Sequence, residues 1–196
     1  MMRIVVCDLD YTLCNTSSLG LFYRYLVSRG CVSISNRIFI FLRYIFFRMG
    51  IVSSSMLKER VLKALKGRSQ DELNRLAKCF VSSVSLNNFR SEILEYLKRE
   101  KEKGARIVLL TGAFSFYSNE IGRHFLFDHV FATDVDFKDG VCCGTCRKGY
   151  LDEEKKKAIL TAFIREHSVN CKASTGFGNH EDKLWLDMLG CKKYII

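Results

Sequence analysis

The sequence predicts an α/β fold in which a parallel sheet carries the chemistry and a block of helices is inserted near the amino terminus. Two apolar runs, residues 3–7 and 106–110, have the composition of strands that are buried on both faces. Residues 15–88, which lie between the two runs, show helical and not strand periodicity. At 196 residues, the chain is long enough for one such domain with a modest insertion.

The first apolar run leads into two acids on a tight turn. Ile4, Val5 and Val6 precede Asp8 and Asp10. Open α/β sheets bind their ligands at the carboxyl ends of the strands, so both carboxylates are expected beside a ligand. Two acids this close repel each other unless a cation joins them, which favours a functional pair over an ordinary turn.

The inserted helices are expected to form a cap that gates access to these acids. Apolar residues recur on one face of each of three segments, and the third follows a capping box from Ser69 to Glu72. The three faces consist of Leu19, Phe22 and Leu26, of Leu57, Val61 and Leu65, and of Leu73, Leu76 and Phe80. We therefore predict a cap domain at residues 15–88 and a core domain made of residues 1–14 and 89–196.

Within the cap, residues 37–52 combine many aromatic side chains with three arginines. The stretch is too short and too charged to span a bilayer, which needs about 20 apolar residues. Such a helix can lie on an anionic membrane surface, or it can pack inside the cap with its arginines directed outward. The net charge of +10 suits a polyanionic partner, but no nucleic-acid-binding module is present, so no specific nucleic acid is expected.

The second apolar run continues into Thr111 and Gly112. A junction between a strand and a helix is a good place to bind an anion, because free backbone N–H groups point outward there. Thr111 can equally be an ordinary helix cap. Further on, residues 150–160 open an amphipathic helix with two acids and three consecutive lysines, Lys155, Lys156 and Lys157. The chain is expected to end in a strand at residues 194–196.

Taken in order, the segments around Asp8, Thr111, Lys155 and Asn179 resemble the four motifs of the haloacid dehalogenase superfamily, over nearly the whole chain. The resemblance implies a Rossmann-like core sheet with an inserted helical cap. It also implies a phosphatase in which Asp8 is the nucleophile and Asp10 the general acid and base.

The resemblance assigns roles to the later motifs as well. Thr111 and Gly112 would hold the phosphoryl group, and a lysine would neutralise it. The glutamate–lysine opening of the helix favours Lys155, although Lys156 satisfies the same spacing to an apolar residue. Mg²⁺ would be held by the acids and amide Asp8, Asp10, Asn179 and Asp182.

The fourth motif departs from the usual pattern of the superfamily. Asn179 stands where an aspartate is usual, one residue is missing before Asp182, and Glu181 could substitute. An amide offers Mg²⁺ a neutral oxygen, so the ion would have one negative charge fewer around it. His180 is expected to be a surface residue, since Mg²⁺ prefers oxygen ligands.

The cap of four helices resembles the phosphoserine phosphatase branch, subfamily IB. Residues 21–26, 110–113 and 176–179 together are most similar to phosphatidylglycerophosphatase C-type proteins. This similarity implies a lipid-linked or amphiphilic phosphomonoester substrate and peripheral contact with an anionic membrane. The alternatives are a soluble phosphatase of a small metabolite such as phosphoserine, and a degenerate member that binds phosphate without turnover.

The cysteines and the amino-terminal segment bear on location. Most of the nine cysteines lie in apolar segments, where free cysteine behaves as a small hydrophobic residue. Cys142, Cys143 and Cys146 lack a fourth ligand for zinc. Acids at positions 8 and 10 are incompatible with the apolar core of a secretory signal. We therefore expect a cytoplasmic protein, peripheral at the inner membrane surface if the lipid alternative holds.

Overall fold

A computed structural model describes residues 1–51, 53–84 and 86–195 of the chain. Within these residues, five strands form one parallel sheet in the order β3-β2-β1-β6-β7. The strands are β1 (Ile4–Cys7), β2 (Arg106–Phe114), β3 (His129–Thr133), β6 (Thr175–Gly178) and β7 (Cys191–Tyr194). The predicted α/β fold is confirmed. The last strand begins earlier than expected, and Ile196 lies outside the described residues.

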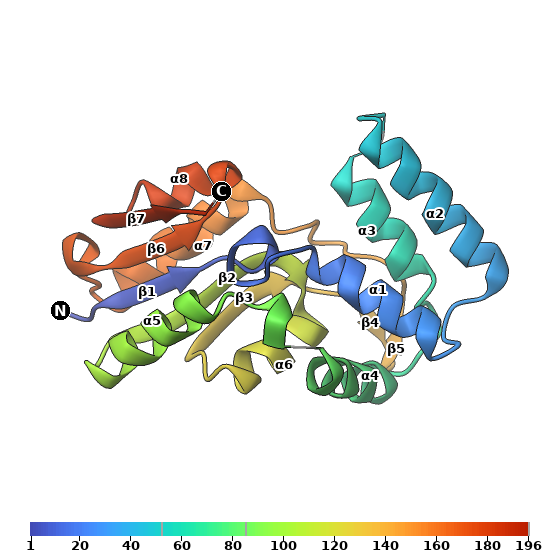
Figure 1. The fold of residues 1–196 in the computed structure, drawn as a ribbon, viewed down its shortest axis with the longest axis horizontal. Helices are drawn as coiled ribbons and strands as arrows, with labels where there is room; N and C mark the ends of the chain where they lie inside the picture. The colour runs from blue at the N-terminus through green and yellow to red at the C-terminus, as the bar shows by residue number, and fades with distance from the viewer. Residues whose placement is uncertain (52, 85, 196) are drawn as a thin grey trace.

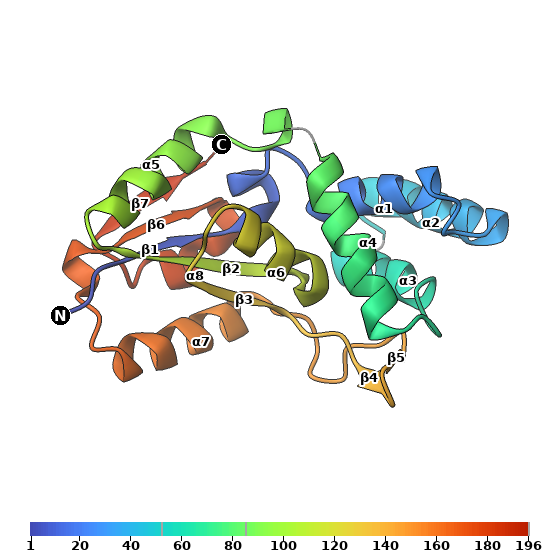
Figure 2. The same cartoon turned by 90° about the horizontal axis from the view of Figure 1, so that it is seen from below.

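Helices cover both faces of the sheet (Figures 1 and 2). They are α5 (Ser91–Glu102) and α6 (Ser115–His124) on one face, and α7 (Glu153–Glu166) and α8 (Lys183–Leu186) on the other. Alternate residues of β1 serve the two layers: Val5 and Cys7 pack with α5 and α6, whereas Ile4 and Val6 pack with α7 and α8. This double burial explains why β1 is continuously apolar in sequence.

The inserted helices lie beyond the carboxyl end of β1 (Figure 1). They are α1 (Ser18–Ser28), α2 (Ile34–Arg48), α3 (Ser54–Lys63) and α4 (Gln70–Ser83). Each follows a serine whose hydroxyl accepts a hydrogen bond from a backbone N–H of the first turn, namely Ser17, Ser33, Ser53 and Ser69. This capping defines where each helix begins. The division into a core and a cap domain at residues 15 and 88 stays a prediction.

Aromatic rings fasten α1 and α4 to the core helix α6. The ring of Phe22 stacks on that of Tyr117 with centroids 5.1 Å apart, and Phe80 meets Phe22 edge-on at 5.2 Å. All three side chains are buried. In contrast, α2 and α3 extend away from the sheet in both views (Figures 1 and 2). The insertion therefore has one half that is packed on the core and one half that projects from it.

A small hairpin precedes α7. Its strands are β4 (Phe137–Lys138) and β5 (Val141–Cys142), which pair antiparallel. Asp139 and Gly140 have φ angles of 51° and 75°, the positive values that a tight hairpin turn requires. The backbone N–H of Cys142 donates to the Arg68 carbonyl at 2.8 Å, so the hairpin contacts the segment between α3 and α4.

Candidate active site

A cavity of about 1900 Å³ lies between the carboxyl ends of the strands and helices α1, α2 and α3. Its walls include every residue that the sequence nominated, from four separate segments of the chain. These residues are Asp8, Asp10, Thr111, Gly112, Lys155, Asn179 and Asp182. The parallel topology brings them together, because β1, β2 and β6 are neighbours and all end at the same edge.

Asp8 directly follows β1 and is only 3% exposed. Its backbone N–H donates to the Phe177 carbonyl at 2.9 Å, and its Oδ1 accepts from Lys156 Nζ at 3.1 Å. Burial raises the pKa of the Asp8 carboxyl to about 7, and the carboxylates of Asp182 and Asp10 add to this while Lys156 opposes it. The carboxylate thus lies in a site that holds more negative than positive charge.

Asp10 is directed by the turn that follows β1. Tyr11 has a left-handed φ of 58°, and the N–H of Leu13 returns to the Asp8 carbonyl at 3.2 Å. Asp10 Oδ1 accepts from the backbone N–H of Ser18, the first residue of α1, at 2.7 Å. This hydrogen bond to the N-terminus of α1 holds the second acid at the cavity wall.

Thr111 and Gly112 lie within β2 and not at a helix start, because the strand continues to Phe114 before α6 begins. The Thr111 hydroxyl accepts from the Ala113 N–H at 3.1 Å. The Gly112 carbonyl accepts from Lys58 Nζ and from the Thr133 hydroxyl, each at 2.9 Å. A Cβ at Gly112 would lie 2.9 Å from the Leu151 carbonyl oxygen, so glycine is required for this close approach.

Lys58 is a cavity residue that the sequence did not nominate. It comes from α3 and lies over the Tyr150 ring, 5.8 Å from its centroid. Burial lowers the pKa of its ammonium, while Asp10 and Asp8 oppose that shift. Nothing in the local pattern distinguished Lys58 from the other basic residues of the insertion, because only the folded chain brings its Nζ to the Gly112 carbonyl.

The lysine that meets Asp8 is Lys156, which corrects the expectation of Lys155. Lys156 is buried, and its Nζ lies 3.1 Å from Asp8 Oδ1 and 2.8 Å from Asp182 Oδ1. Lys155 Nζ instead donates to the carbonyls of Lys148 and Tyr150 at 2.9 and 3.0 Å. The helix register decides between them: the inward face of α7 consists of Lys156, Leu160 and Phe163.

Asp182 has a different setting from the one expected of a metal ligand. It is fully buried, and its Oδ1 accepts from both Lys156 Nζ and the Trp185 indole N–H, at 2.8 and 2.9 Å. Its Oδ2 accepts from the Asn179 N–H at 2.9 Å. Each oxygen is therefore already engaged, and the role that this geometry gives Asp182 is to hold Lys156 in place.

Asn179 begins the turn after β6, and its Oδ1 accepts from the Glu181 N–H at 2.8 Å. Glu181 and His180 are both exposed to solvent. Both line the cavity, so the expectation that Glu181 could substitute for the missing aspartate stays a prediction. The side chain of Asn179 remains on the cavity wall with a neutral oxygen.

Glu153 is a second cavity residue that the sequence did not nominate. Its Oε1 forms an ion pair with Lys156 Nζ at 3.0 Å, whereas its Oε2 is buried and has no hydrogen-bond partner. Burial raises the pKa of its carboxyl to about 7, and the nearby Asp182 carboxylate adds to the shift. By sequence it was an ordinary acid in the first turn of a helix, and only its spacing of three residues from Lys156 could have indicated more.

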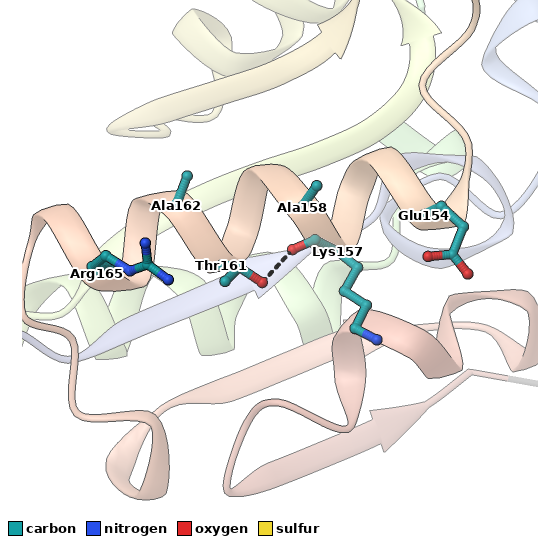
Figure 3. Close-up of a pocket in the computed structure, with 6 residues that line it drawn as sticks. All are labelled: Glu154, Lys157, Ala158, Thr161, Ala162 and Arg165. Atoms are coloured by element: carbon teal, nitrogen blue, oxygen red, sulfur yellow. Dashed lines mark hydrogen bonds between the residues drawn. The ribbon is translucent and has the colours of Figure 1, made fainter.

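The outer face of α7 carries none of this chemistry. A depression of about 440 Å³ lies there, bordered by Glu154, Lys157 and Arg165 among others, whose side chains are drawn in Figure 3. The Thr161 hydroxyl donates to the Lys157 carbonyl at 2.8 Å, a bond within the helix itself (Figure 3). Glu154 and Lys157 thus provide solvent-side counterparts of Glu153 and Lys156.

The sequence matches one family model, described as haloacid dehalogenase-like hydrolase, over residues 5–182. The chain belongs to this family. A curated relative is the phosphoserine phosphatase of Archaeoglobus fulgidus, which is 23% identical over 135 residues, 68% of this chain and 37% of that protein. The chain therefore spans little more than a third of the length of this curated relative.

Solved structures share the haloacid dehalogenase-like fold with the chain. A protein of unknown function from Bordetella pertussis Tohama I has a TM-score of 0.82 at 20% identity, covering 98% of this chain and 89% of that one. A family hydrolase from Salmonella enterica serovar Typhi has a TM-score of 0.72 at 17% identity, covering 96% and 60%. A phospho-aspartyl intermediate analogue of phosphoserine phosphatase has a TM-score of 0.66 at 18% identity, covering 97% and 85%.

Proposed function

We propose that the chain is a phosphomonoester hydrolase that works through a phosphoryl group carried on Asp8. The observation that carries this proposal is the position of Lys156, which is buried between Asp8 and Asp182 at the wall of a large cavity. Asp10 lies two residues further along, and its carboxylate accepts a hydrogen bond from the first residue of α1. The similarity to phosphoserine phosphatases supports the same reaction class.

In the proposed reaction, an Asp8 oxygen attacks phosphorus and the bond to the leaving oxygen breaks. Asp10 donates its proton to that leaving oxygen, and then accepts a proton from the water that hydrolyses the aspartyl-phosphate. Lys156, the Thr111 hydroxyl and the backbone at Gly112 offset the negative charge on the remaining phosphoryl oxygens. Asp182 acts as a positioning residue for Lys156.

Phosphatases of this superfamily generally use Mg²⁺, and the residues of the cavity suit it. Asp8, Asp182 and Glu153 place three carboxylates around one ammonium, and the buried Glu153 Oε2 has no partner. Among the described residues, no three His, Cys, Asp or Glu side chains form a ready-made metal site. Mg²⁺ does not need one, since it is commonly held by one or two carboxylates together with waters and substrate phosphate.

We propose that Asp8, Asp10 and Asn179 hold this Mg²⁺, which supplies positive charge at the transferring phosphoryl group. Asp182, also expected as a ligand, has both oxygens in hydrogen bonds to other groups. Asp182 would therefore contribute negative charge close to the cation and not a ligand oxygen.

We further propose an amphiphilic substrate, such as a lipid-linked phosphomonoester. The cavity continues from the acids into the insertion, where its wall becomes largely apolar. This part of the wall includes Leu19, Tyr23, Val27, Ile40 and Phe41 from α1 and α2. An apolar group attached to the phosphate would be buried against this wall, whereas a small polar metabolite has no such group to bury.

The outer face of α2 supports the proposal of a peripheral contact with an anionic membrane, namely the cytoplasmic surface of the inner membrane. Ile38 is 56% exposed and Phe41 61%, and Met49, directly after the helix, is 64% exposed. The helix contains Arg37 and Arg43 but no acid, which suits anionic headgroups. The side chain of Arg48 lies outside the described part of the structure. No described helix is long and apolar enough to cross a bilayer.

A soluble phosphatase of a small metabolite such as phosphoserine is the second candidate. It is favoured by the similarity to the Archaeoglobus fulgidus phosphoserine phosphatase. The cavity can accommodate a small polar substrate near Asp8 without use of its apolar part. Its basic wall residues, including Lys58 and Arg24, could meet a second charged group.

One screen separates these candidates. The purified chain is assayed with para-nitrophenyl phosphate, phosphoserine and a lipid phosphomonoester in phosphatidylglycerol vesicles, each with and without Mg²⁺. The proposal expects Mg²⁺-dependent turnover of the generic substrate and the highest kcat/KM for the lipid. A preference for phosphoserine supports the second candidate. Absence of turnover with all three substrates, together with retained phosphate binding, identifies a degenerate member of the family.

A further inference from the structure

Lys156 is surrounded by more negative charge than it can balance. Its Nζ lies 3.1 Å from Asp8 Oδ1, 2.8 Å from Asp182 Oδ1 and 3.0 Å from Glu153 Oε1. Because all three oxygens lie this close to one nitrogen, no two of them are further apart than about twice that distance. With every carboxylate ionised, this group carries a net charge of about −2, the charge that one divalent cation would cancel.

Glu153 contributes the least satisfied atom of this group. Its Oε2 is buried and accepts no hydrogen bond among the described residues, although the carboxylate of Asp182 is near enough to perturb it. A buried acceptor without a partner is costly, and a second carboxylate beside it increases the cost. An added cation would relieve both effects at this position.

Asn179 leaves a deficit of negative charge beside the same cluster, because its backbone N–H donates to Asp182 Oδ2 at 2.9 Å. It lies after β6 at the cavity wall with a neutral amide oxygen, and the neighbouring acid Glu181 is exposed to solvent. Both acids line the cavity, but only Glu153 is ion-paired with Lys156 and also has a buried oxygen, Oε2, without a hydrogen-bond partner among the described residues. Its charge can therefore replace the one that a carboxylate at position 179 would supply.

We propose that Glu153 is part of the oxygen environment of the divalent cation in the active site and supplies the negative charge that Asn179 lacks. This inference rests on the proposed function only in placing a divalent cation beside Asp8. It predicts a coupling between two residues from different segments: the importance of Glu153 depends on what stands at position 179.

Binding of the metal alone tests this inference. Mg²⁺ and Mn²⁺ are titrated calorimetrically into the wild type, Glu153→Gln and Glu154→Gln, without substrate. Gln keeps an oxygen for Lys156 but loses the charge, and Glu154 on the outer face of α7 is the matched control (Figure 3). We expect about 10- to 100-fold weaker binding for Glu153→Gln, the range seen when supporting groups of metal sites are removed. Glu154→Gln should bind as the wild type does.

A second variant separates a role toward the cation from mere support of Lys156. Asn179→Asp should bind Mg²⁺ more tightly than the wild type, and in the Glu153→Gln background it should restore most of the lost affinity. A purely structural Glu153 would lower the melting temperature of the metal-free protein and would not be rescued from position 179. Circular dichroism of the metal-free variants verifies that each is folded.

The inference is overturned if Glu153→Gln binds both metals as the wild type does, if Asn179→Asp fails to rescue it, or if the wild type binds neither metal. Failure of the proposed function has a different signature. In that case the wild type binds Mg²⁺ with the predicted dependence on Glu153 and yet hydrolyses no phosphomonoester.

Discussion

The carboxyl edge of the sheet and the outer face of α2 differ in what each keeps from water. At the sheet edge, Asp8, Lys156 and Asp182 are charged groups that are at most 6% exposed and bonded to one another. On α2, apolar side chains such as Ile38 and Phe41 are more than half exposed. One region buries charge and the other exposes hydrophobic surface, and each arrangement is unfavourable for folding alone.

Because neither arrangement stabilises the fold, the difference indicates that each region serves a function. A buried ion cluster gives pre-organised electrostatics, and an exposed apolar face gives a surface for an apolar partner. The cavity connects the two regions, because its wall runs from Asp8 to Phe41. We infer that the phosphate end of a substrate belongs to the first region and its apolar end to the second.

The largest expected effect is loss of turnover without loss of membrane binding. Asp8→Asn removes the proposed nucleophile and should lower kcat for para-nitrophenyl phosphate by about 10⁴-fold or more, as loss of a nucleophile does in other hydrolases. Binding to vesicles should not change, since Asp8 lies far along the cavity from the exposed face of α2. Undiminished turnover by this variant would refute the assignment of Asp8.

The next effect concerns the lysine register of α7. Lys156→Ala leaves two buried carboxylates, Asp8 and Asp182, without their cation and should lower the free energy of unfolding by about 3–5 kcal/mol. Lys155→Ala loses only bonds to two carbonyls, a cost of about 1 kcal/mol. Lys157→Ala, on the outer face, should stay within about 0.5 kcal/mol of the wild type. Urea unfolding of the three variants gives the ranking, and equal losses at positions 155 and 156 would contradict the register.

Substitutions on the exposed face of α2 should weaken membrane binding and leave stability nearly unchanged. Replacing Ile38 and Phe46 by Ser removes two partly exposed apolar side chains, each worth about 1.5–3 kcal/mol when buried in a membrane. Release from phosphatidylglycerol vesicles should follow, with little change in melting temperature or in turnover of a small soluble substrate. The matched control is Leu86→Ser, which changes a 64% exposed residue elsewhere.

Co-sedimentation with vesicles at low and high salt measures this effect. Binding of the wild type should weaken with salt but persist, because the apolar contribution does not depend on ionic strength. A wild type that stays in the supernatant at low salt would end the membrane proposal. A large drop in melting temperature of the double variant would show that these side chains pack inside the insertion.

The smallest effect is a pH dependence of stability. The Asp8 carboxyl has a pKa of about 7 in the folded protein, above its ordinary value of 3.8, so the folded state holds an extra proton between these values. Its contribution to stability is complete below about pH 4 and is lost as the pH rises through 7. Asp8→Asn does not titrate, so its melting temperature relative to the wild type should be higher at pH 8 than at pH 5, by about 2–4 °C for each kcal/mol of that contribution.

Scanning calorimetry in metal-free buffer measures this difference. Glu153 titrates in the same range in both proteins and therefore largely cancels in the comparison. Mg²⁺ should reduce the difference at pH 8, because a cation beside Asp8 removes the reason for its raised pKa. A constant difference across the pH range would contradict the charged setting that we describe for Asp8.

The sequence was informative where one segment carried the whole signal. Asp8 and Asp10 stand two residues apart behind a buried strand, so local pattern sufficed to place them at the sheet edge. Lys155 and Lys156 could not be separated this way, because both have an apolar residue four positions on. Only the packing of Leu160 and Phe163 against the sheet fixes which lysine is directed inward.

Residues that matter only because of their tertiary contacts could not be identified from the sequence. Glu153 and Lys58 are charged residues on amphipathic helices, which by pattern belong to a solvated face. They become partly buried because their side chains reach the cavity at the carboxyl edge of the sheet, where Glu153 meets Lys156 and Lys58 meets the Gly112 carbonyl. For α2, the pattern allowed both a packed and an exposed helix, and the structure leaves much of its apolar surface exposed.

The central claim is that Asp8 accepts a phosphoryl group while Lys156 stands beside it. The most direct measurement is the intact mass of Asp10→Asn after incubation with para-nitrophenyl phosphate and Mg²⁺ and an acid quench. This variant retains the nucleophile but lacks the base that activates water, so we predict a mass increase of one phosphoryl group, which peptide mapping places on Asp8. Asp8→Asn should show none. A phosphoryl group on any other residue, or equal labelling of both variants, would contradict the account.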